Sequence, residues 1–310
     1  MTTTLSDMIN EVSMNLSGYT LTQDRSTYLR TAVTGTTSSS ASPTVLSLGS
    51  TENVGKGIVE VDEELFWIDT YDRIGNTATV APYGRGYLGT TAATHALDAK
   101  VTISPTFPKF SIKRAINDTI KGLSGILFAA DTTTITYSSA VSTYRLPATG
   151  TITGGIRNIL SVAYESIGPS KEWIPIRSWR FDANANITSF DSEQTISIYD
   201  MITSGRTIQI VYSKDPTPFS TNADVFTTQT GLPDSCRDLV VTGSIYRLLA
   251  NLDPARAAMV SAQADETDSK RPYGSSQSLT RQIYALYTQR LAEEVKSQQN
   301  KYPIRVHYSL

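Results

Sequence analysis

The spacing of apolar residues changes repeatedly along this 310-residue chain, and this limits the folds that it can adopt. Within residues 5–16, 111–127, 233–250 and 279–299, apolar residues recur every three or four positions, which is typical of amphipathic helices. Between these segments, short runs bounded by turn residues alternate apolar with polar side chains, which is typical of strands. Candidate strands lie at 45–48, 57–61, 65–71, 77–81, 100–103, 135–137, 143–146, 158–164, 173–181, 194–199 and 207–212.

Dispersed helices bury their apolar stripes most simply by converging on one core, with the strand regions inserted between them. We therefore predict an α+β fold with a helical bundle core, two inserted antiparallel β subdomains and an extended C-terminal tail. A second short helix is predicted at 23–32, before a Ser/Thr/Gly segment that breaks it. The predicted bundle core consists of Leu5, Ile9, Val12, Ile112, Ile116, Ile120, Leu123, Leu127, Leu239, Tyr246, Ile283 and Leu286.

These patterns divide the chain into six predicted segments. In order, they are the N-terminal helices of the bundle (1–33), a small β-barrel or sandwich (34–107), the central bundle helix (108–130), a second β subdomain (131–232), the C-terminal bundle helices (233–300) and an extended tail (301–310).

The tail, which reads KYPIRVHYSL, is predicted to leave the body of the protein. Pro303 lacks an N–H and biases Tyr302 away from the α region, so the preceding helix must stop there. Beyond it, two unlike faces alternate as in a strand: Ile304, Val306, Tyr308 and Leu310 on one, Arg305, His307 and Ser309 on the other. Such a strand can fold back on an earlier sheet of its own chain or add to a sheet in a partner, and both alternatives stay open.

Charge and composition exclude several classes of function. The net charge of −2 provides no global basic field, so duplex DNA should be a poor ligand at equilibrium. A single cysteine, Cys236, excludes an intramolecular disulfide and a zinc site built on cysteines. No apolar run approaches the ~20 residues that span a bilayer. We therefore expect a soluble protein made in the cytoplasm, with no cofactor and no membrane contact.

No catalytic constellation is recognisable, so we do not expect an enzyme. His95 has the surroundings of a loop histidine hydrogen-bonded to its neighbours. The carboxylates at 62–64 could hold a metal, but at a tight turn such a run is usually solvated. Residues 83–90 are glycine-rich but lack the ending of a phosphate loop, which favours turns. Trp173 and Trp179 are more typical of a packed β core or interface than of a carbohydrate platform.

Residues 57–101 resemble the small β module of structural proteins from tailed bacteriophages. The resemblance rests on an acidic turn at 62–64 that leads into the aromatic and apolar strand 65–68, followed by Arg85-Gly86, Gly89-Thr90 and His95. Physically, Arg85, Gly86, Gly89 and Thr90 would fix turns of the loop, and His95 would anchor it by hydrogen bonding.

The helices around this module resemble those of phage head-to-tail adaptors, also called connector proteins. This resemblance covers the chain before residue 131 and after residue 232. It implies a homo-oligomeric ring of twelve copies in the neck of the virion. Residues 302–310 would bind the portal protein above, a stopper or tail-completion protein would bind below, and DNA would pass through only as cargo. The alternatives are a minor tail or baseplate protein and a host-surface-binding module.

Overall fold

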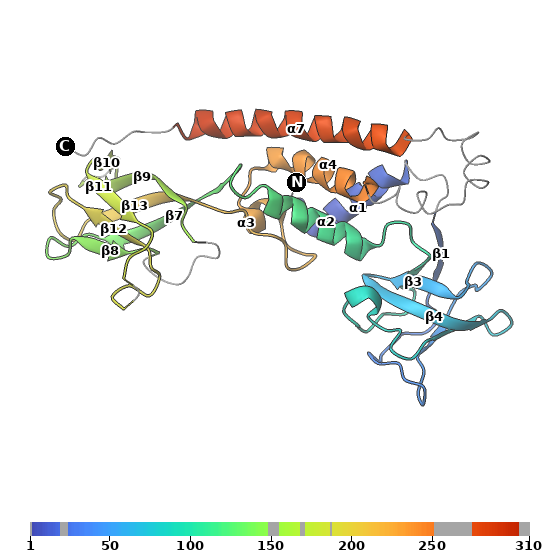
Figure 1. Ribbon diagram of the computed structural model, residues 1–310. Coiled ribbons are helices and arrows are strands. Elements are labelled where there is room, and N and C mark those ends of the chain that lie inside the picture. Colours follow the sequence, from blue (N-terminus) through green and yellow to red (C-terminus); the bar gives the residue numbers. More distant parts are fainter. Residues whose placement is uncertain are drawn as a thin grey trace. The chain divides into compact units, whose positions relative to one another are not determined.

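The computed structural model of the chain describes residues 2–18, 24–147, 155–167, 171–186, 188–250 and 275–303 (Figure 1). The chain forms two compact units, each assembled from segments that are distant in the sequence. Unit 1 consists of Met1–Leu5, Asn117–Val240 and Tyr284–Leu310, and unit 2 of Ser6–Ile116 and Val241–Ile283.

The described residues contain five α-helices, one of them much longer than the rest. They are α1 (Leu5–Ser17), α2 (Lys109–Gly122), α3 (Phe226–Thr230), α4 (Arg237–Leu249) and α7 (Ser275–Lys301), with 3-10 turns η1 (Tyr87–Gly89) and η2 (Asp234–Cys236). The helix α7 ends two residues before Pro303, which confirms the predicted stop. No described helix is both long and apolar enough to span a membrane.

Unit 2 contains a six-stranded antiparallel sheet in the order β1-β6-β3-β4-β5-β2. Its strands are β1 (Arg25–Tyr28), β2 (Val45–Ser47), β3 (Gly57–Val61), β4 (Glu64–Asp72), β5 (Thr77–Val80) and β6 (Lys100–Ile103). Alternate apolar residues of these strands, among them Val59, Phe66 and Val101, meet in one buried cluster. Between β3 and β4 the chain turns in two residues, with Asp62 at a φ of 54°.

Unit 1 contains a four-stranded sheet, β10-β9-β13-β7, and a three-stranded sheet, β11-β12-β8. Their bounds are β7 (Ala129–Thr136), β8 (Thr143–Arg145), β9 (Asn158–Glu165), β10 (Trp173–Pro175), β11 (Trp179–Asp182), β12 (Thr195–Ile198) and β13 (Thr207–Lys214). Residues of both sheets, including Ile196 and Ile208, share one buried cluster. Trp179 packs against this cluster, whereas Trp173 is exposed on β10.

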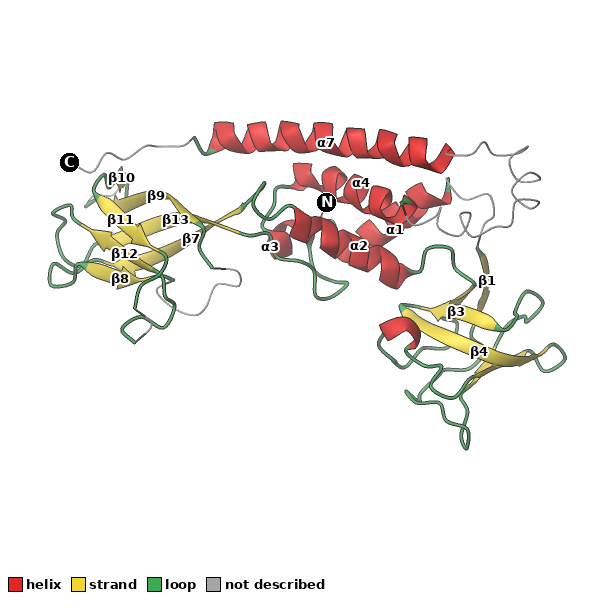
Figure 2. Cartoon of the chain, viewed as in Figure 1, coloured by secondary structure: helices red, strands yellow, loops and turns green. Residues whose placement is uncertain are grey.

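The prediction of a helical bundle core is wrong. Thirteen strands in three antiparallel sheets run through the described residues (Figure 2), and each of the two strand regions has a hydrophobic cluster of its own. The physical reason is that the alternating runs supply enough inward-facing side chains to form cores without the helices. Each strand region is therefore a folded body with its own hydrophobic core, and not an insertion that depends on a helical bundle.

The predicted helix at 23–32 is also wrong, because Arg25–Tyr28 is strand β1. It pairs with β6 from Arg25 opposite Ile103 to Tyr28 opposite Lys100. This partner is distant in the sequence, so a local helical pattern could not reveal it. All the segments that were predicted as strands contain strands, although the run at 173–181 is divided into β10 and β11.

Most of the residues predicted to lie on the inner sides of helices are buried. They are Leu5, Ile9, Val12, Ile112, Ile116, Ile120, Leu123, Leu127, Leu239 and Ile283. Tyr246 is half-buried, and Leu286 is 53% exposed, which contradicts its predicted burial. The buried side of α7 follows Ile283 and Tyr287, and Leu286 lies beside this line.

The substitution Ile116→Ala should lower the free energy of unfolding by ~2–5 kcal/mol, through lost burial and the cavity that it leaves. Ile116 is fully buried, whereas Ile74 is almost fully exposed and provides a control with the same chemistry. Chemical denaturation should show a change within ~0.5 kcal/mol for Ile74→Ala. Equal denaturation midpoints for Ile116→Ala and Ile74→Ala would contradict the burial of Ile116.

Candidate functional site

A buried ion pair holds the loop 83–95 against the sheet of unit 2. The guanidinium of Arg85 donates from Nε to Oε1 of Glu64 at 2.7 Å and from Nη2 to Oε2 at 3.0 Å. The two side chains are 2% and 1% exposed. This parallel geometry is the strongest form of an arginine–carboxylate contact, and burial shields it from water.

The same two side chains also bind the backbone of the loop. Arg85 donates to the carbonyl oxygens of Gly35 and Ala93, and Glu64 accepts the N–H groups of Gly86 and Ala93, both at 2.9 Å. The side chains of Arg85 and Glu64 thus bind backbone groups of Gly35, Gly86 and Ala93 as well as each other. The ion pair therefore sets the path of the loop and of the segment around Gly35.

His95 completes this cluster by lying between two carboxylates. Its Nδ1 is 2.7 Å from Oδ2 of Asp62, and its Nε2 is 2.9 Å from Oε2 of Glu64. Burial alone would lower the pKa of His95, but the hydrogen bonds with Glu64 and Asp62 outweigh it and raise that pKa above its ordinary value. The backbone of His95 also pairs in both directions with Val33.

Glu64 is the centre of the cluster and was not recognised from the sequence. Burial would raise its pKa, but hydrogen bonds from His95, Arg85 and two backbone N–H groups lower that pKa to about 2. The expectation that the run 62–64 is solvated is wrong for Glu64, the inward-facing first residue of β4. No local sequence signal pointed to Glu64, because Arg85 and His95 lie more than 20 residues away from it in the chain.

The other three residues predicted for this loop, Gly86, Gly89 and Thr90, are not members of the cluster of Arg85, Glu64 and His95. Gly86 has a φ of 59°, and a Cβ there would lie 2.7 Å from the carbonyl oxygen of Thr90, so only glycine fits. The hydroxyl of Thr90 accepts the N–H of Leu65 at 3.1 Å. Gly89 is exposed with a φ of 83°. The loop is thus pinned from inside, while Leu88 is 65% exposed on its surface.

Two further carboxylates on the β3–β4 hairpin contact the start of α2. Glu60 is buried and accepts the N–H of Lys109 at 2.6 Å, and Glu63 lies 3.3 Å from the ammonium of Lys113. Burial raises the pKa of Glu60 to about 7, although the N–H of Lys109 acts in the opposite direction. Glu60 is therefore a buried acceptor whose charge changes near neutral pH.

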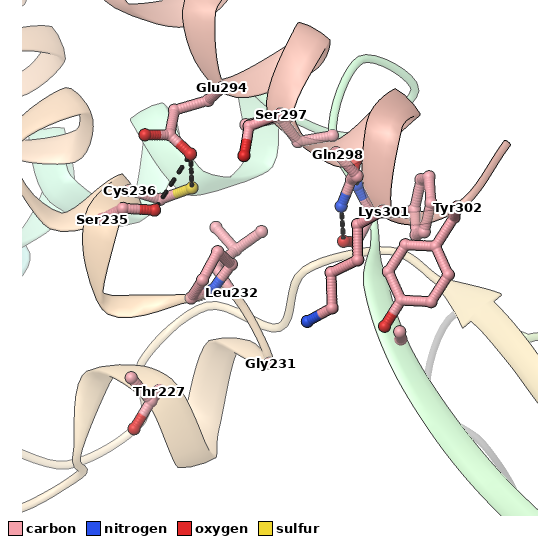
Figure 3. Close-up of a pocket in the computed structure, with 14 residues that line it drawn as sticks. Thr227, Gly231, Leu232, Ser235, Cys236, Glu294, Ser297, Gln298, Lys301 and Tyr302 are labelled. Atoms are coloured by element: carbon pink, nitrogen blue, oxygen red, sulfur yellow. Dashed lines mark hydrogen bonds between the residues drawn. The ribbon is translucent and has the colours of Figure 1, made fainter.

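In unit 1, a cavity of about 370 Å³ lies beside the C-terminal end of α7 (Figure 3). Glu294 is buried there and accepts hydrogen bonds from the hydroxyl of Ser235 at 3.0 Å and from the thiol of Cys236 at 3.6 Å. Burial, followed by the nearby charge of Glu294, raises the pKa of Cys236 to about 12. This thiol is therefore a packed side chain rather than a nucleophile.

The last turn of α7 is clamped to the residue that precedes β7. The amide of Gln298 donates to the carbonyl oxygen of Phe128 at 2.6 Å and accepts the N–H of Phe128 at 3.2 Å. The ring centroids of Tyr302 and Phe128 are 5.7 Å apart. Glu294 and Gln298 were missed in the sequence. A signal existed for Glu294, because this carboxylate continues the buried line of Ile283 and Tyr287.

The structure describes only the beginning of the predicted portal-binding tail. Tyr302 is half-buried and packs on Phe128, so it belongs to the body of unit 1 rather than to the tail. Pro303 is exposed. The remaining tail residues, Ile304, Arg305, Val306, His307, Tyr308 and Leu310, lie outside the described residues.

A protein-family model described as SU10 adaptor protein matches residues 88–306, which is more than half of the chain. The chain belongs to the SU10 adaptor protein family. Comparison with curated protein sequences gives no match. Membership of this family indicates a phage structural adaptor and a component of the virion, rather than an enzyme. The match includes the second β region, which the resemblance seen in the sequence had left out.

Protonation of Glu60 should make the stability of the protein depend on pH. The pKa of Glu60 in the folded protein lies above its unfolded value of 4.5. The contribution of protonated Glu60 to the free energy of unfolding is therefore complete below pH 4.5 and is lost as the pH rises through about 7. Glu60→Gln keeps the oxygen that accepts from Lys109 but removes this titration. We expect its free energy of unfolding to fall less than that of the wild type between pH 5 and 8, by on the order of 1–3 kcal/mol. Glu63→Gln is the matched control, and parallel pH profiles for Glu60→Gln and the wild type would contradict the assignment.

Removal of the Arg85 guanidinium should be strongly destabilising. Arg85→Met leaves Glu64 buried without its main donor, which should cost ~3–5 kcal/mol of unfolding free energy in chemical denaturation. The double variant Arg85→Met/Glu64→Leu should recover part of this loss, because it removes the unpaired charge. Arg73→Met, at an exposed arginine, is the control. A loss in the single variant no larger than in this control would refute the role of the ion pair.

Proposed function

We propose that this protein is a head-to-tail adaptor that forms a ring under the portal, joins the capsid to the tail and lets DNA pass. The observation that carries this proposal is the match to the SU10 adaptor family across residues 88–306. The resemblance of the flanking helices to phage connector proteins supports a ring of twelve copies in the virion neck. A stopper or tail-completion protein would bind on the opposite side of the ring from the portal.

In this proposal, residues 304–310 are the tether to the portal. The clamp of Gln298 and Tyr302 on Phe128 supports it, because a tether needs a firm origin on the body of the subunit. Seven extended residues reach at most ~23–25 Å beyond Pro303. A single tail would bind weakly, but many tails on one ring act at ~mM effective concentration and form a durable joint.

Charge supports a passive role toward DNA. With 27 basic and 29 acidic residues, the chain has a net charge of −2. Non-specific binding to duplex DNA depends on the neutralisation of phosphates by clustered lysines and arginines. A ring of such subunits would let DNA slide through instead of gripping it.

Truncation after Pro303 should leave a folded protein that fails to join portal rings in vitro. Val306→Asp should have the same effect, because it places a charge on the apolar side of the tail strand. The matched control is His307→Asp, which places the same charge on the polar side and should still assemble. Negative-stain imaging and co-sedimentation with purified portal measure the outcome.

Normal occupancy of the truncated protein on portal would refute the tether. A minor tail or baseplate protein, the alternative reading, would instead bind tail components and leave portal rings bare.

A further inference from the structure

Strand β7 forms the longest open edge among the sheets that the structure describes. All eight of its residues pair with β13, from Ala129 opposite Lys214 to Thr136 opposite Thr207, and no described strand pairs with its other side. The other five edge strands, β1, β2, β8, β10 and β11, are only three or four residues long. One of them, β10, also ends in Pro175, which cannot donate to a neighbouring strand.

The side chains of β7 protect this edge at one described point, where Oδ1 of Asp131 accepts the N–H of Thr132 at 2.8 Å. The strand contains no proline and no lysine, the residues that commonly block an open edge. Its single charge, Asp131, is held by the ammonium of Lys214 on β13 at 2.7 Å. The β-branched residues 132–136 favour an extended strand. An edge of this kind is suited to receive one more strand.

The chain itself brings a suitable strand to this place. Gln298 and Tyr302 hold the end of α7 on Phe128, the residue immediately before β7, and the described chain ends at Pro303, one residue after this contact. The seven residues 304–310 match the eight of β7 in length, and their apolar and polar residues alternate as in a strand. Because both segments start near Phe128, they would run parallel.

We propose that residues 304–310 occupy the open edge of β7 in the free subunit, and that binding to the portal removes them from it. The second half of this proposal rests on the proposed function. Attachment beside the edge gives the segment a high effective concentration there, so few hydrogen bonds suffice to hold it. The same few bonds can be exchanged for those of a partner's sheet. The tail would thus stay paired with β7 until the subunit binds the portal.

Hydrogen exchange of the free protein tests the first half without any partner. In the full chain, the β7 amides that do not bond to β13 should exchange at least ~10-fold more slowly than in the chain truncated after Pro303. Val306→Pro should resemble the truncation, because proline cannot donate or sit within a paired strand. His307→Ala is its control and should keep the protection. The amides of β9 should be the same in all four proteins.

Equal exchange of β7 in the full and truncated chains would overturn the pairing. Protection that appears only at high protein concentration would also overturn it, because the occupant would then be a second copy. Addition of purified portal should raise β7 exchange to the rate of the truncated chain, and continued protection in the complex would overturn the release. If the chain does not bind portal at all, the proposed function and the release fail, and the free-protein comparison still decides the pairing.

Discussion

Two hydrogen bonds between the side chain of Gln298 and the main chain of Phe128 join the longest described helix to the residue before the longest open edge of the described sheets. An amide that both donates to and accepts from one residue leaves little freedom in the distance and angle between the two backbones. The rings of Tyr302 and Phe128, tilted by 54° to each other, add a second point of contact one turn later. The exit of the C-terminal segment is therefore set by packing within unit 1, and every role considered for that segment depends on it.

The loop of unit 2 is held by a different kind of interaction. Arg85, Glu64 and His95 are buried together, and their charges are compensated within the cluster and by backbone groups. A buried ion pair of this kind contributes little net stability but penalises any arrangement that separates its members. Its effect is to give one defined shape to a loop with exposed apolar residues. Leu88 is thereby held at the surface of this loop.

The family match changes how the second β region is understood. The resemblance seen in the sequence rested on helices and on the first β module, and it left residues 131–232 without a place. The match runs from residue 88 through that region to residue 306. The sheet that holds β7 and β13 therefore lies within the matched residues. This is consistent with a design in which the sheet and the end of α7 work together.

Local patterns determined many of the elements. The period of the apolar residues placed β3, β6, β9 and α7, and Pro303 determined the end of α7, because side-chain alternation and a missing N–H act on neighbouring residues. Only the tertiary structure decided what these elements form. The sequence showed too few inward-facing residues to predict the first half of β7, which becomes a strand by pairing with β13. Glu64 was equally invisible, because its partners lie more than 20 residues away, and desolvation and compensation depend on the whole surroundings.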